Sequence, residues 1–183
     1  MASTTTNSEP EKLKEEGLRL FNDGAYTEAL ENFDHAYKGF LDAGNSVEAA
    51  EMLNNMGVVY RVEGSLSEAA EKLDAARKMF ADMGDRSREA QTLGNLAPLY
   101  SKQGSVDKAV ETYDQAAEIF NELNDKDRRG EVLMAKGLLL FKKGQRTKGL
   151  AAYEVGLGLL QKPTGQQKRL RTMLKLRQKI MGG

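Results

Sequence analysis

The chain repeats itself at a spacing of 40 residues, and this period constrains its fold more than any other feature. Within each copy, a large apolar or aromatic residue stands four positions before a fixed glycine, and a small residue stands five positions after it. The glycine column is Gly24, Gly64, Gly104 and Gly144. Four copies in register without a gap predict an array built from one repeated supersecondary unit.

Each copy contains two stretches with the apolar spacing of an amphipathic helix. In the second copy these positions are Leu53, Met56, Gly57 and Tyr60, then Ala69, Leu73, Ala76 and Phe80. A glycine turn separates the two stretches, and Ser65 with Glu68 predicts a capping box at the start of the second helix. Each unit is therefore predicted to be a helical hairpin, with small residues that let its helices approach closely.

The connections between copies carry helix-ending and helix-starting residue types. Residues that tolerate the left-handed conformation end the second helices, and N-cap residues follow them directly. The pairs are Gly44–Asn45, Gly84–Asp85 and Asn124–Asp125. Copy four differs, because Gly149, Gly156 and Gly158 lie inside its second helix and each is expected to cost about 1 kcal/mol relative to alanine.

These columns resemble the tetratricopeptide repeat (TPR) in a long, 40-residue form. The resemblance implies an all-α fold, a right-handed superhelical solenoid of four helical hairpins with a C-terminal capping helix. We predict a disordered N-terminal tail over residues 1–8 and four repeats within residues 9–162. The repeats are expected at about 9–44, 45–84, 85–124 and 125–162, and the capping helix at 165–181.

The composition excludes several kinds of site. There is no cysteine, and the single histidine, His35, cannot form a multi-histidine metal centre. No close pair of carboxylates stands in a context that predicts a catalytic pocket, so we expect neither enzymatic activity nor a cofactor. No apolar run is long enough to span a membrane, and no secretory leader opens the sequence. We therefore expect a cytoplasmic protein.

The charge is divided unevenly along a chain whose net charge is zero. Residues 1–91 hold 10 Lys/Arg and 18 Asp/Glu, a net of −8, and residues 92–183 hold 17 and 9, a net of +8. Such a division could steer a partner or favour head-to-tail association. Two well-solvated halves of a monomer are the simpler interpretation.

The candidate ligand site is the concave face that the first helices of such hairpins form. Positions one residue beyond the core stripe turn about 100° around the helix and should face this groove. The predicted peptide-binding residues are Lys14, Leu18, Asn54, Asn55, Val58, Arg61, Asn95 and Leu138. A carboxamide both donates and accepts hydrogen bonds, so Asn55 and Asn95 could hold a peptide backbone, as the resemblance to long-repeat proteins implies. A clamp for a C-terminal carboxylate, as in chaperone co-factors, is rejected because this chain matches it only at Lys14 and Asn55.

Two further features permit more than one interpretation. Leu18, Phe21, Leu138 and Phe141 could form apolar pockets at the groove ends, although packing between repeats is the expected role of the two phenylalanines. Pro98 falls inside a predicted helix, where it removes the hydrogen bond to the carbonyl of Gly94 and could widen the groove.

The sequence thus predicts a non-catalytic module that binds a peptide segment of a protein partner in its groove. One alternative is an assembly scaffold that acts through its convex or charged surfaces, or through self-association. Another is attachment to a membrane or RNA through the basic C-terminal helix. This last alternative is disfavoured because no aromatic residue interleaves the basic ones, and we expect no DNA partner.

Overall fold

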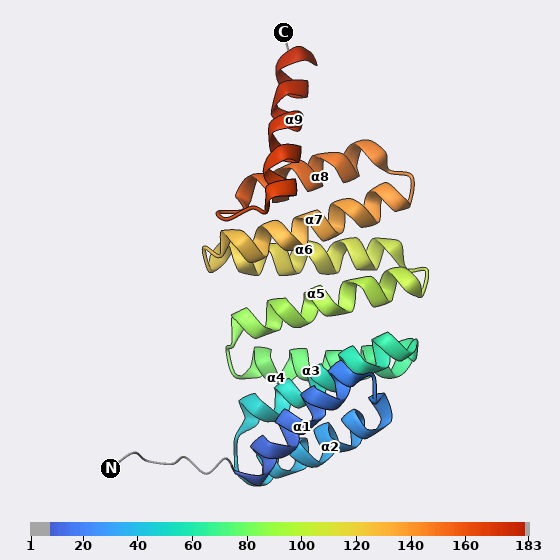
Figure 1. Ribbon diagram of the computed structural model, residues 1–183, viewed down its shortest axis with the longest axis vertical. Coiled ribbons are helices and arrows are strands. Elements are labelled where there is room, and N and C mark those ends of the chain that lie inside the picture. The colour runs from blue at the N-terminus through green and yellow to red at the C-terminus, as the bar shows by residue number, and fades with distance from the viewer. Residues whose placement is uncertain (1–7, 182–183) are drawn as a thin grey trace, which may run out of the picture. The chain divides into compact units, whose positions relative to one another are not determined.

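The structure, a computed structural model, describes residues 8–181, with side chains as far as residue 174. Within these residues the chain forms nine α-helices and no strand (Figure 1). The helices are α1 (Glu9–Asp23), α2 (Tyr26–Asp42), α3 (Ser46–Glu63), α4 (Leu66–Asp82), α5 (Arg86–Lys102), α6 (Val106–Glu122), α7 (Lys126–Lys142), α8 (Arg146–Leu159) and α9 (Gly165–Met181). The predicted all-α, helical-repeat fold is therefore confirmed. The predicted N-terminal tail lies outside the described residues except for Ser8.

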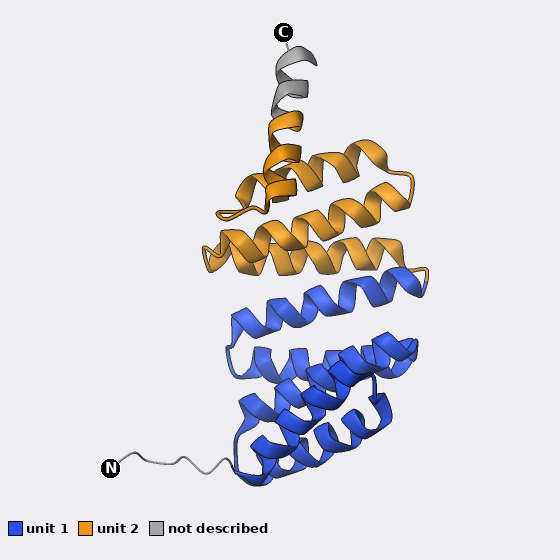
Figure 2. Cartoon of the chain, viewed as in Figure 1, with its two compact units in different colours: residues 1–103 blue, residues 104–183 orange. Residues whose placement is uncertain are grey.

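The chain divides into two compact units, residues 1–103 and residues 104–183 (Figure 2). Unit 1 contains α1 to α5, and unit 2 contains α6 to α9. In both units, helices that follow one another in the chain pack side by side.

The connections between hairpins have the predicted chemistry at both ends. Gly84 has φ 71° and Asn124 has φ 56°, so both adopt the left-handed conformation that ends a helix. The carboxylates of Asp85 and Asp125 then accept hydrogen bonds of 3.0 Å from the backbone N–H of Arg88 and Arg128. The predicted capping box at Ser65 is wrong, because the Ser65 side chain makes no capping hydrogen bond. The backbone alone closes this turn, through a hydrogen bond from the Ser65 N–H to the Tyr60 carbonyl.

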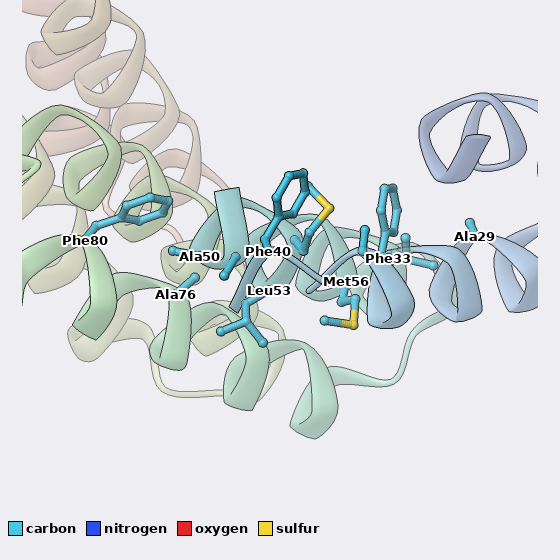
Figure 3. Packing of buried hydrophobic residues seen from close by; sticks show 12 residues of the cluster. Ala29, Phe33, Phe40, Ala50, Leu53, Met56, Ala76 and Phe80 are labelled. Atoms are coloured by element: carbon cyan, nitrogen blue, oxygen red, sulfur yellow. The ribbon is translucent and has the colours of Figure 1, made fainter. Parts of the chain in front are cut away.

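The core of unit 1 is a continuous cluster of apolar side chains from α2, α3 and α4. Figure 3 shows Phe33 and Phe40 of α2 in this cluster with Met56 of α3, and Phe80 of α4 at its other end. Gly57 of α3 leaves room at the backbone for a branched side chain of α4. A Cβ atom at Gly57 would lie 2.5 Å from Cγ of Leu73, closer than real Cβ atoms approach a neighbour.

Unit 2 contains a helix pair held together by glycines, α7 and α8. A Cβ atom at Gly137 would lie 2.6 Å from the carbonyl oxygen of Gly149, and one at Gly130 would lie 2.6 Å from the carbonyl oxygen of Gly156. The two backbones therefore touch at two places. Gly149 and Gly156 are thus not only a cost to helix propensity, as the sequence suggested, because they permit this contact.

The structure answers two questions that the sequence raised: whether Pro98 interrupts its helix, and whether any described helix could cross a membrane. Helix α5 runs without interruption from Arg86 to Lys102, so Pro98 lies within an unbroken helix. Among the described residues, no helix has both the length and the apolar character needed to cross a membrane.

Candidate functional site

The first helices of unit 1 bring three of the predicted binding residues together. Leu18 on α1 and Asn55 and Val58 on α3 line one small pocket, which we call the Asn55 pocket. Phe21 of α1 and Phe33 of α2 complete its wall. Its volume is about 60 Å³, enough for the end of one apolar side chain but not for a drug-sized molecule.

Asn55 supplies the polar group of this pocket. Its side chain is partly buried and makes no hydrogen bond to any other described residue. Leu18, opposite it, is 39% exposed. A carboxamide beside an accessible apolar surface can accept from a peptide N–H and donate to a peptide carbonyl.

The other two predicted asparagines bind each other. The side-chain NH₂ of Asn95 on α5 donates to Oδ1 of Asn54 on α3 over 3.2 Å. The buried hydroxyl of Thr92 lies 3.5 Å from the same oxygen and donates to the carbonyl of Arg88 over 2.9 Å. These side chains therefore join two neighbouring first helices, and a peptide would have to compete with that bond.

Lys14 is likewise engaged within unit 1. Its ammonium lies 2.5 Å from Glu48 and 3.2 Å from Glu51, both on α3. Burial by itself would lower the pKa of Lys14, but the hydrogen bonds to these two carboxylates outweigh it and raise the pKa. Glu51 also accepts a 2.6 Å hydrogen bond from Arg88 on α5. Lys14, Glu51 and Arg88 thus link α1, α3 and α5 in one charged network.

Arg61 stands on α3, one turn beyond Val58. Its Nε–H is buried and has no hydrogen-bond partner among the described residues. A buried donor without a partner is costly, so this group favours an acceptor brought by a ligand. The residue as a whole is partly exposed.

Leu138 lines a different pocket, in unit 2. This second pocket, which we call the Phe141 pocket, has a volume of about 310 Å³. Helices α7, α8 and α9 all contribute to its lining, which consists of Gly137, Leu138, Phe141, Gly149, Leu150, Tyr153 and Leu170. Leu138 is 53% exposed and Phe141 is 51% exposed, so the expectation that Phe141 packs in the core is wrong. Phe21, by contrast, does pack against the core of unit 1.

Sequence reasoning did not include Leu150, Tyr153 and Leu170 in the site. The glycines of α8 could have indicated this surface, because Gly149 and Gly156 lack side chains and so allow α8 to lie directly against α7. The larger neighbours of these glycines then have only part of their surface covered. No described residues form a group of three or more potential metal ligands, and His35 is exposed.

Comparison with known proteins gives a family and a fold. Residues 23–155 match the family model described as SNAP, soluble NSF attachment protein. The crystal structure of BtubC (BKLC) from P. vanneervenii resembles this chain with a TM-score of 0.71 at 18% sequence identity. That alignment covers 95% of this chain and 69% of the other, and at this identity it informs the fold alone. The comparison with curated proteins yields no significant match.

Proposed function

The chain belongs to the soluble NSF attachment protein family, and from this we propose that it is a non-catalytic adaptor that binds a segment of a protein partner on the first helices of unit 1. The family is named for attachment to another protein, which supports an adaptor role here. The tetratricopeptide character of the repeats and the use of their concave groove are parts of the same proposal. Helical repeats serve many partners, so the site must carry the argument.

The observation that carries the proposal is the Asn55 pocket. It places a carboxamide without a partner among described residues beside an accessible apolar wall made by Leu18 and Val58. An extended peptide needs both elements, because backbone hydrogen bonds give affinity and a side-chain pocket gives specificity. The pocket holds one small apolar side chain, such as that of alanine or valine.

Arg61 adds a preference for negative charge. Its buried Nε–H gains an acceptor if the bound segment carries a carboxylate near its apolar residue. Lys14, Asn54 and Asn95, which the sequence also suggested, are held by bonds within unit 1. We therefore assign direct contact to Leu18, Asn55, Val58 and Arg61, and a supporting role to the other three.

The test is affinity capture of partners by the full chain, comparing wild type with Asn55→Ala and with Val58→Glu. Asn32→Ala is the matched control, because Asn32 lies on α2 and its side chain donates to the carbonyl of Glu28. We expect a partner that wild type and the control recover and that both pocket variants lose. Circular dichroism must show unchanged helix content in all four proteins.

Retention of the same partners by Asn55→Ala and Val58→Glu would exclude the Asn55 pocket as the binding site.

The second candidate function is self-association. Unit 1 carries 11 Lys/Arg and 18 Asp/Glu, a net of −7, whereas unit 2 carries 16 and 9, a net of +7. Opposite charges on two units favour head-to-tail contact between copies. Sedimentation at low and high salt tests this, since such contact predicts a mass that rises with concentration and falls with salt.

A further inference from the structure

The Phe141 pocket is not used by the function proposed above. Side chains from three helices of unit 2 converge on it, and its volume of about 310 Å³ accommodates a large apolar side chain. Two of its lining residues, Leu138 and Phe141, have about half of their surface in contact with solvent. Large apolar side chains grouped around one exposed hollow are typical of an interaction surface.

The part of the chain that lines this pocket carries almost entirely positive charge. Residues 132–183 contain 12 Lys/Arg and a single acidic residue, Glu154. Six exposed basic side chains lie close in sequence to the lining residues: Lys142, Lys143, Arg146, Lys148, Lys168 and Arg169. None of the six forms an ion pair with another residue in the part of the chain whose side chains are described.

Arg146 connects the basic rim to the apolar surface. Its guanidinium carbon lies 6.0 Å from the centre of the Phe141 ring, at the turn that joins α7 to α8. A ligand that places an apolar side chain against Phe141 therefore brings its neighbouring residues beside a cation. Carboxylates at those positions would gain charge-assisted hydrogen bonds.

We propose that the Phe141 pocket is a second binding site, which takes an acidic amphipathic segment of a protein partner. One large apolar side chain of that segment fills the pocket, and its carboxylates pair with the basic rim. The shape favours a peptide over a lipid surface, because a bounded hollow receives a side chain whereas a membrane needs protruding apolar groups. The site lies wholly within unit 2, so it does not depend on the Asn55 pocket.

The experiment uses the full chain and two fluorescein-labelled helical peptides with leucines at the same i, i+3, i+4 and i+7 positions. One peptide has glutamate at its polar positions and the other has lysine. Binding is followed by fluorescence anisotropy for wild type, Leu138→Gln, Phe141→Ala and Arg146→Glu. Val155→Gln and Lys126→Glu are matched controls, because Val155 is 56% exposed on α8 without lining the pocket and Lys126 lies at the far end of α7.

We expect wild type to bind the glutamate peptide and not the lysine peptide. Leu138→Gln and Phe141→Ala should each weaken binding about tenfold, the usual effect of losing an anchor contact. Arg146→Glu should weaken binding and reduce its dependence on salt, whereas both controls should leave it unchanged. Unchanged helix content confirms that the variants fold.

Four outcomes would overturn the proposal. The first is absence of binding of the glutamate peptide by wild type, and the second is equal binding of the two peptides. The third is that wild type co-sediments with phosphatidylserine–phosphatidylcholine vesicles, that Leu138→Gln does not, and that neither binds the glutamate peptide. This result would make the pocket a lipid site. The fourth is a concentration-dependent mass that Leu138→Gln abolishes, which would identify a second copy as the occupant.

Discussion

The side-chain NH₂ of Asn95 donates a 3.2 Å hydrogen bond to Oδ1 of Asn54, which joins α5 to α3 within unit 1. The two residues lie one position apart in their respective repeats, so the bond connects neighbouring copies. Asn55, the next residue along α3, instead lines a pocket, and its side chain makes no hydrogen bond to any other described residue. Adjacent asparagines on one helix thus differ in their contacts, one joining neighbouring repeats and the other lining an open pocket.

A double-mutant cycle on this pair should reveal the difference. Asn54→Ala and Asn95→Ala are each expected to lower the free energy of unfolding by about 1 kcal/mol, because each leaves a partly buried partner unpaired. The double variant should lose less than the sum, with a coupling of about 0.5–1.5 kcal/mol. Asn55→Ala is the control, expected to stay within about 0.5 kcal/mol of wild type. Urea denaturation measures all four, and additive losses would show that the bond contributes nothing in solution.

Two glycines of α8 should respond in opposite directions to the same substitution. A Cβ atom at Gly156 would clash with the carbonyl oxygen of Gly130 on α7, and Gly156 itself is buried, so Gly156→Ala forces α7 and α8 apart. A loss of about 1–3 kcal/mol is expected. Gly158→Ala meets no atom within 4 Å and is exposed, so it should gain up to about 1 kcal/mol from helix propensity. Equal effects of the two variants on the thermal midpoint would contradict the close contact between α7 and α8.

Acid should weaken the connection between α4 and α5 through Asp85. Burial by itself would raise the pKa of Asp85, but hydrogen bonds from the backbone and guanidinium of Arg88 outweigh it and lower the pKa. A carboxylate with a lowered folded-state pKa contributes stability above its unfolded pKa of about 4, and loses it as the pH falls through the folded value. Asp85→Asn keeps an acceptor at the N-cap but does not titrate.

The variant should therefore lose less stability than wild type between about pH 5 and pH 2, as followed by thermal denaturation across that range. The exposed Asp42→Asn serves as the control, because the Asp42 carboxylate forms no ion pair with any other residue whose side chain is described. Parallel curves for wild type and Asp85→Asn would show that this carboxylate has no special stabilising role.

The sequence predicted the helices of this chain well because their signals are local. Apolar spacing, left-handed glycines and N-cap residues act within a few positions, so the residue types at Asp85 and Asp125 are enough to predict that helices start there. The site was harder to predict, because its outcome depends on pairing between helices. A column of polar residues does not reveal that Lys14 pairs with Glu51 or that Asn95 turns toward Asn54. Phe141 was misplaced for the same reason, because it is half exposed at a point where the backbones of α7 and α8 lie close together.

Pro98 lies inside α5, although a proline at this position should lower the stability of the helix. Replacing Pro98 tests whether this lower stability contributes to partner binding. Helix α5 continues through this residue, although proline supplies no N–H to the carbonyl of Gly94. Pro98→Ala should therefore raise the free energy of unfolding by about 1–3 kcal/mol. Ser101→Ala, on the same helix, is the control and should gain only a few tenths of a kcal/mol.

The same two variants should then be compared in partner capture. If the local weakness of α5 helps the first helices adapt to a ligand, Pro98→Ala will be more stable and will recover less partner, whereas Ser101→Ala will recover as much as wild type. Greater stability with unchanged capture would show that the proline is merely tolerated. A drop in stability would mean that the Pro98 ring makes packing contacts that outweigh the missing hydrogen bond, which would contradict the expected gain.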